Sequence, residues 1–99
     1  MEAVTHWRAI HLVDQGTTHI VGFMHDHQRY RVTSPVVVYD ADADSVHTLS
    51  GSHYRLEGPP GDADLLLRGF VGWLIKQNMD ATVQDVTENF GAVSIGKLH

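Results

Sequence analysis

Three histidines in the first third of the chain have a spacing that could place them around one metal ion. His25 and His27 stand two residues apart, so both side chains would leave the same face of a strand. In a tight hairpin His6 would be the cross-strand neighbour of His25 and could supply a third imidazole, a ligand common in zinc sites. No fourth ligand stands beside them, and a polar turn after a strand accounts for the same residues. We therefore expect no cofactor, and keep His6, His25 and His27 as candidate ligands of a metal- or pH-responsive domain.

Carboxylates gather in a second segment. Asp40, Asp42 and Asp44 alternate as the first, third and fifth ligands of a calcium-binding loop do. That loop also needs glycine at its sixth position and glutamate at its twelfth, where this chain has Ser45 and Gly51. A solvated turn that meets Lys or Arg side chains of a partner is the better interpretation. The candidate partner-binding residues are these aspartates and two more near the start of a predicted helix: Asp40, Asp42, Asp44, Asp62 and Asp64.

A serine and a histidine that adjoin in the sequence do not make a catalytic pair. Ser52 and His53 stand side by side in a predicted strand, and neighbouring residues of a strand point to opposite faces. The chain has no cysteine and no glycine-rich phosphate-binding motif. These observations favour a protein that is not an enzyme.

Composition narrows the class of partner. The 99 residues carry seven Lys and Arg against twelve Asp and Glu, a formal net charge of −5. Without a basic run, direct contact with nucleic acid is disfavoured, and a basic protein surface is the favoured partner. No apolar run approaches the ~18 residues of a membrane span, and the N-terminus lacks the features of a signal peptide. We expect a cytoplasmic protein without a membrane partner, with a homodimer as one arrangement.

Runs of β-branched and aromatic residues between turn residues indicate a sheet in the first part of the chain. We expect an α+β fold, an antiparallel β-meander of about five strands packed by one amphipathic helix. The expected strands are Val4–Val13, Thr18–His25, Tyr30–Tyr39 with an interruption at Ser34-Pro35, Val46–Leu49 and His53–Leu56.

The first two of these strands should form a hairpin with two apolar faces. A tight turn at residues 14–17 would set Leu12 opposite His19, Ile10 opposite Val21, Arg8 opposite Phe23 and His6 opposite His25. One face then carries Ile10, Leu12, Val21 and Phe23, and the other carries Trp7, Val13, Ile20 and Met24. Such a hairpin should be covered on both sides or should dimerise.

A helix follows the loop Gly58-Pro59-Pro60-Gly61. Asp62 is the expected N-cap, and an apolar stripe with helical spacing contains Leu66, Phe70, Trp73 and Leu74. Phe70 and Trp73 should be buried against the sheet. The segment from Thr82 to Phe90 is compatible with a short second helix or with a strand, and we favour the helix. The chain is thus expected to be one domain, residues 1–99, with the sheet at about 4–57, the main helix at about 62–78 and a C-terminal segment at 82–95.

Two short motifs carry a resemblance to a protein family. They are Thr33-Ser34-x-Val36 and Thr48-x-Ser50-Gly51-Ser52-x-Tyr54-x-Leu56. Together they resemble a class of short proteins from proteobacterial phages and integrated mobile elements, over residues 7–56 and without the later helix. The chain departs from that pattern at residues 25–28, where a turn with Pro or Gly would be usual.

The resemblance implies a binding function. Such proteins often act as small binders that block host defence complexes, with anti-CRISPR proteins as the best-known example. It implies here a small acidic protein-binding module that occludes a host protein or protein–nucleic-acid complex with a basic surface. A histidine-based metal- or pH-responsive domain and a small structural or oligomerisation domain are the alternatives.

Overall fold

The computed structural model describes residues 1–92 and 96–98. Its strands are β1 (Glu2–Leu12), β2 (Thr17–Met24), β3 (Arg29–Val32), β4 (Val36–Asp40), β5 (Ser45–Thr48), β6 (His53–Leu56), β7 (Val83–Asp85) and β8 (Gly96–Leu98). Helix α1 spans Ala63–Lys76, and a 3-10 helix, η1, spans Thr87–Ala92. In these described residues no helix is both long enough and apolar enough to cross a membrane.

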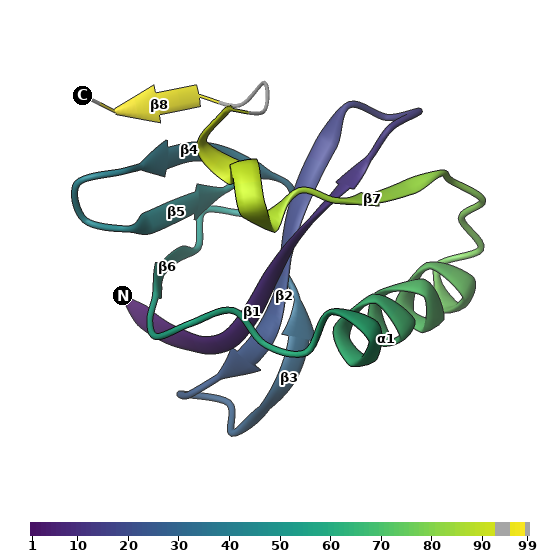
Figure 1. Ribbon diagram of the computed structural model, residues 1–99, viewed down its shortest axis with the longest axis horizontal. Helices are drawn as coiled ribbons and strands as arrows, with labels where there is room; N and C mark the ends of the chain where they lie inside the picture. The colour runs from purple at the N-terminus through teal and green to yellow at the C-terminus, as the bar shows by residue number, and fades with distance from the viewer. Residues whose placement is uncertain (93–95, 99) are drawn as a thin grey trace.

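The strands form one mixed sheet, so the expected antiparallel meander is wrong. Their order is β3-β2-β1-β6-β5-β4-β8, and β7 also pairs with β1. The pairs β1–β6 and β4–β8 are parallel, and each joins strands that are far apart in the sequence. Figure 1 shows α1 at one end of the molecule beside β1, β2 and β3, and β4, β5 and β8 at the other end. In a meander β1 would lie at one edge of the sheet and pair with β2 alone. Here β1 lies inside the sheet, between β2 and β6.

The expected third strand, Tyr30–Tyr39, is in fact two strands in different parts of the sheet. β3 pairs with β2, whereas β4 pairs with β5 and β8. Pro35 lies between them, and its missing N–H makes it unable to continue a ladder. The proline thus ends one half of the sheet and lets the chain cross to the other half.

The β1–β2 hairpin is two residues out of the expected register. Leu12 lies opposite Thr17 and Ile10 opposite His19, because the turn closes earlier, with the Gly16 N–H donating to the Leu12 carbonyl at 2.9 Å. Gly16 has a φ of 67°, a conformation that costs glycine little. A shift of two residues keeps Ile10, Leu12, Ile20 and Val21 on their expected faces because side chains alternate with a period of two. Val13 lies beyond the end of β1 and is exposed.

Both faces of the hairpin are covered, in two separate hydrophobic clusters. On one face Ile10, Leu12 and Val21 pack beneath α1 against three buried helix residues, Leu66, Phe70 and Leu74. The other face lies inside the curved sheet with a second cluster, whose buried members are Val4, Trp7, Ala9, Ile20, Met24, Val36, Val46, Leu56, Val86 and Phe90. The sheet therefore separates a helix-covered core from a sheet-enclosed core.

A bulge in β1 divides that strand between two partners. The register shifts between Thr5 and Arg8, and His6 has a φ of 50°. Before the bulge β1 pairs with β6, and after it β1 pairs with β7. The loop before α1 closes the gap, because the Gly61 N–H donates to the Trp7 carbonyl at 3.1 Å. A Cβ at Gly61 would lie 2.6 Å from the His6 carbonyl oxygen, so this approach requires glycine.

The main helix agrees with the expectation, and the C-terminal segment does not. Asp62 is the N-cap and accepts a hydrogen bond from the Leu65 N–H at 2.8 Å. In the C-terminal segment the favoured helix is wrong over residues 83–85, which form β7 on the exposed edge of β1. A 3-10 helix follows at Thr87–Ala92, and residues 93–95 of the expected segment lie outside the described residues.

The Thr33–Val36 and Thr48–Leu56 motifs meet in space through their hydroxyl groups. Ser34 Oγ donates to Ser50 Oγ at 2.8 Å and accepts from the Ser50 N–H. Thr48 Oγ1 lies 3.2 Å from Ser50 Oγ and accepts from the Ser52 N–H. These bonds tie the chain just before Pro35 to the β5–β6 turn, which is a structural role.

Candidate functional site

A groove of about 510 Å³ lies between strand β3 and helix α1. Its lining is almost wholly apolar and comes from two strands and the helix: Val21, Tyr30, Arg31, Val32, Leu65, Leu66, Gly69 and Trp73. Its volume falls in the ordinary range for a binding pocket, ~300–1,000 Å³. These eight residues include no carboxylate and no imidazole, so the groove is suited to binding and not to acid–base chemistry.

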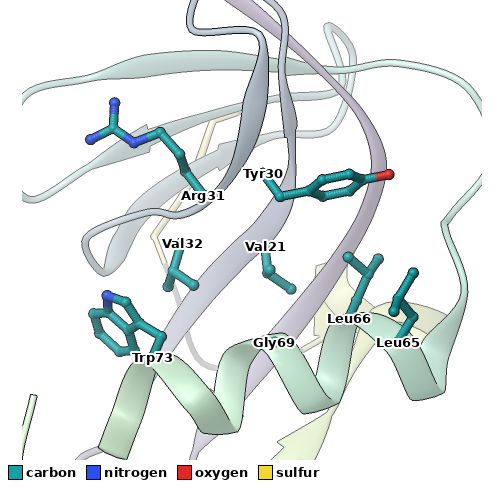
Figure 2. Close-up of a pocket in the computed structure, with 8 residues that line it drawn as sticks. All are labelled: Val21, Tyr30, Arg31, Val32, Leu65, Leu66, Gly69 and Trp73. Carbon is teal, nitrogen blue, oxygen red and sulfur yellow. The ribbon is translucent and has the colours of Figure 1, made fainter. Parts of the chain in front are cut away.

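Helix α1 forms one wall because of how its residues are spaced. Leu66, Gly69 and Trp73 recur at helical intervals on the side that faces β3. Figure 2 shows the leucine side chains rising from one turn of the helix and Trp73 from a later turn, with Gly69 between them. The glycine has no side chain, so the helix surface is low at that point and the groove opens there.

Gly69 is not required by the packing of the helix. A Cβ built at Gly69 would meet nothing within 4 Å, and the same is true at Gly72. Glycine inside a helix costs about 0.8–1 kcal/mol relative to alanine. The chain therefore accepts a cost in helix stability at Gly69 with no steric reason within the fold, which is consistent with space kept for a ligand.

Strand β3 forms the other wall and lies at one end of the sheet order. In the part of the chain that the structure describes, β3 pairs with β2 alone, so its outer edge is open. Tyr30 is 51% exposed and Leu65, across the groove, is 63% exposed. In Figure 2 Val21 and Val32 point toward the helix, and the guanidinium of Arg31 points away from it.

His19 packs against two aromatic side chains of α1, one of which lines the groove. Its ring lies 5.7 Å from the Trp73 ring and 5.8 Å from the Phe70 ring, measured between centroids. Nδ1 of His19 is 2.8 Å from the Thr33 carbonyl oxygen, to which it can donate. Burial lowers the pKa of His19, although the hydrogen bond to Thr33 partly opposes this shift. A neutral imidazole therefore packs behind Trp73 at neutral pH.

The five candidate aspartates lie in two places. Asp40, Asp42 and Asp44 are in the β4–β5 region, whereas Asp62 and Asp64 are at the start of α1. Figure 1 shows the β4–β5 loop well apart from helix α1. Three of the five have bonds within the fold, since Asp62 caps α1, Asp40 accepts from the Asp42 N–H at 3.1 Å and Asp44 accepts from the Tyr39 hydroxyl at 3.0 Å.

The bond to Asp44 has an electrostatic consequence for its tyrosine partner. Burial, together with the hydrogen bond to Asp44, raises the pKa of Tyr39 to about 12. Tyr39 is therefore a neutral donor at every pH at which the protein would be handled. The loop between β4 and β5 is held near its start by the bond to Asp40 and near its end by the bond from Tyr39 to Asp44. The loop still exposes Asp42 and Asp44 to solvent.

Two of the three candidate metal ligands have other partners, and the third is exposed. His25 Nε2 lies 2.9 Å from the Thr5 hydroxyl, and His27 Nδ1 lies 3.0 Å from a Glu2 carboxylate oxygen. His6 is exposed at the β1 bulge. Burial alone would raise the pKa of Glu2, but hydrogen bonds from His27 and from the Asp26 N–H hold it below its ordinary value. Among the described residues no group of three His, Asp or Glu side chains is placed to hold a metal ion.

The sequence alone does not indicate the groove. Tyr30 and Val32 belong to a predicted strand and Leu65 to a predicted helix, and the two walls that they form are more than thirty positions apart in the chain. One local signal was present: two glycines interrupt an otherwise strong helix-forming run, at Gly69 and Gly72. Comparisons of this chain with protein-family models, with curated proteins and with solved structures found no match.

Proposed function

We propose that the chain is a protein-binding module that holds apolar side chains of a partner polypeptide in the groove between β3 and α1. The observation that carries the proposal is the groove itself, which is apolar, open and of pocket size. Tyr, Trp and Arg are the residue types that dominate binding energy at protein interfaces. Tyr30 and Trp73 contribute two of these types to the lining, and Arg31 adds the third at the groove's edge, with its guanidinium pointing away from the helix.

The energetics support the same conclusion. Leu65 and Tyr30 leave much of their surface in water in the free protein. Each square ångström of apolar surface that a partner covers contributes about 25 cal/mol. A partner side chain inserted above Gly69 would cover both residues together with Trp73, so one insertion removes apolar surface of three residues from water.

The expected target stays a prediction. Inhibition of a host nucleic-acid-handling complex rests on the resemblance to phage and mobile-element proteins alone. Contact between a basic partner and the acidic loop of Asp40, Asp42 and Asp44 is a second, separate prediction. That loop lies far from the groove (Figure 1), so the two surfaces can be tested independently.

Two helix variants test the proposal as a matched pair. Gly69→Leu fills the groove, and Gly72→Leu adds the same side chain to a different face of α1, beside Leu67 and Ile75. Neither Cβ meets an atom within 4 Å, and both changes remove a glycine from a helix, so neither variant should melt below the wild type.

The assay is selection of peptides from a displayed random library on the wild-type protein, followed by affinity measurement on both variants. We expect the selected peptides to lose about tenfold or more in affinity for Gly69→Leu, the equivalent of 1.4 kcal/mol, and to bind Gly72→Leu like the wild type. Equal affinity for all three proteins would contradict the proposal. A loss confined to Gly72→Leu would place the binding surface on the outer face of α1 instead.

A further inference from the structure

The open edge of β3 presents its backbone groups at the groove, and the hydrogen-bond pattern fixes which residues do so. The Thr33 N–H donates to the Ile20 carbonyl at 2.9 Å, and the Ile20 N–H donates to Thr33 Oγ1 at 3.0 Å, so both backbone groups of Ile20 point toward Thr33 as in a hydrogen-bonded pair. In an antiparallel ladder hydrogen-bonded and non-hydrogen-bonded pairs alternate. Val32 opposite Val21 and Tyr30 opposite Phe23 are therefore non-hydrogen-bonded pairs. The N–H and carbonyl groups of Tyr30 and Val32 point away from β2, toward the open edge.

The side chains of β3 alternate between two different surroundings. Tyr30 and Val32 are on the face that looks toward α1 and line the groove. Arg29 and Arg31 begin on the opposite face, since successive strand residues point to opposite sides. Both arginines are exposed, and among the described residues neither has an ion-pair partner. The edge thus offers an apolar side and a positively charged side.

We infer that the occupant of the groove is an extended peptide segment that adds to the edge of β3 and whose residues alternate between apolar and acidic. Its backbone bonds to Tyr30 and Val32, its apolar side chains enter the groove above Gly69, and its carboxylates lie beside Arg29 and Arg31. This inference rests on the proposed function and names the chemistry of the partner. Strand addition of this kind draws affinity from main-chain bonds and specificity from pockets for alternate side chains.

A second copy of the chain is a poor occupant of the same edge. In antiparallel self-pairing, residues whose backbone groups point outward face each other, so Tyr30 and Val32 must lie opposite Tyr30 or Val32. The two registers that include Tyr30 place Arg29 or Arg31 of one copy opposite Arg29 or Arg31 of the other. The remaining register, with Val32 opposite Val32, overlaps the two β3 strands at that single residue. Like charges directly opposite each other across two strands are destabilising. The charge pattern of β3 therefore favours an acidic partner over a homodimer.

The free protein gives a first check that needs no ligand. Hydrogen exchange followed by NMR should show a protected Arg31 amide, because the alternation of pairs makes Arg31 and Gly22, its partner in the register, a hydrogen-bonded pair. The Tyr30 and Val32 amides should exchange rapidly. The opposite pattern would overturn the inference, because those two residues would then have no groups to offer a peptide.

The probe for binding is an acetylated peptide in which valine and glutamate alternate. Calorimetry should show binding to the wild type, with affinity about tenfold or more lower for the peptide that has lysine in place of glutamate. The double variant Arg29→Gln with Arg31→Gln should weaken the valine–glutamate peptide by a similar factor and remove most of its salt dependence. Arg68→Gln, an exposed arginine on α1 outside the groove, is the matched control and should change little.

Backbone methylation of the probe separates strand addition from simple insertion of side chains. In one direction of pairing the valine amides face β3, and in the other the glutamate amides do. Methylation of one of the two sets should abolish binding, and methylation of the other should be tolerated. In one outcome Gly69→Leu abolishes binding, but methylation of either set of amides and a change in the peptide's charge have no effect. That outcome would overturn the inference and leave the proposed function standing. Binding that ignores Gly69→Leu would overturn both.

Discussion

Asp85→Asn removes the charge of a carboxylate that ties the C-terminal segment to β1. Nε of Arg8 donates to Asp85 at 2.7 Å, and the two side chains are only 12% and 22% exposed. Arg8 also donates to the Gly61 carbonyl at 3.0 Å, so one guanidinium joins β1, the loop before α1 and β7. The pair therefore holds together three parts of the chain that meet at the β1 bulge.

The magnitude follows from this burial. Removing one partner of a fully buried ion pair costs about 3–5 kcal/mol, because the other charge is left without compensation. Here the Gly61 carbonyl remains and asparagine can still accept a hydrogen bond, so we expect a loss of about 2–3 kcal/mol in the free energy of unfolding. Glu88→Gln is the control, since Glu88 is 90% exposed at 3.4 Å from the same arginine. Its loss should stay below about 0.5 kcal/mol.

Urea denaturation of the wild type and the two variants measures both losses, and a pH series adds a second test. Burial would raise the pKa of Asp85, but its bonds to Thr87 and Arg8 lower it below the ordinary value. A lowered folded-state pKa gives stability that is present above the unfolded pKa of about 3.9 and is lost as the pH falls below it. The difference between wild type and Asp85→Asn should therefore shrink below about pH 4. Equal losses for Asp85→Asn and Glu88→Gln would refute the reasoning.

Three further predictions concern the core, the imidazole behind the groove and the loop over β1. Phe70→Ala should lower the free energy of unfolding, measured with urea, by about 3–5 kcal/mol because Phe70 is fully buried. Trp73→Ala should lower it by about 1–2 kcal/mol because the Trp73 ring is only half-buried. Equal losses would show that Trp73 is a core residue. Stability should fall as the pH drops below about 6.5, because a lowered folded-state pKa makes neutral His19 the stabilising form. The melting temperature of His19→Gln should fall less steeply with pH than that of the wild type. An equal slope of melting temperature against pH would contradict this prediction. Gly61→Ala should lower the melting temperature through its overlap with the His6 carbonyl, while Gly69→Ala, the control, should raise it.

Local features of the fold were predictable from the sequence. The bounds of α1 and its cap at Asp62 follow from local pattern, and so does the β6 strand at residues 53–56. The faces of the β1–β2 hairpin were predicted although the register was not, since a two-residue shift preserves alternation. Burial of Phe70 is confirmed, but Trp73 is only partly buried because it lies at the rim of the groove.

Long-range features were not predictable in the same way. The parallel pairing of β1 with β6 joins residues about fifty positions apart, and no local signal specifies such a partner. The segment at residues 83–85 becomes a strand because the edge of β1 beyond its bulge is open to pair with it, which overrides a modest helix preference. The groove was not predictable for the same reason, since its two walls are brought together only by the packing of α1 on the sheet.

An NMR titration of the labelled protein with the alternating valine–glutamate peptide tests the central claim most directly. Backbone amide signals of Tyr30 and Val32 should shift and become protected from exchange, and the signals of Gly69 and Trp73 on α1 should shift with them. Shifts that instead gather on Asp42 and the rest of the β4–β5 loop, or on Val71 and Ile75 on the outer face of α1, would contradict the claim that the groove between β3 and α1 is the binding site.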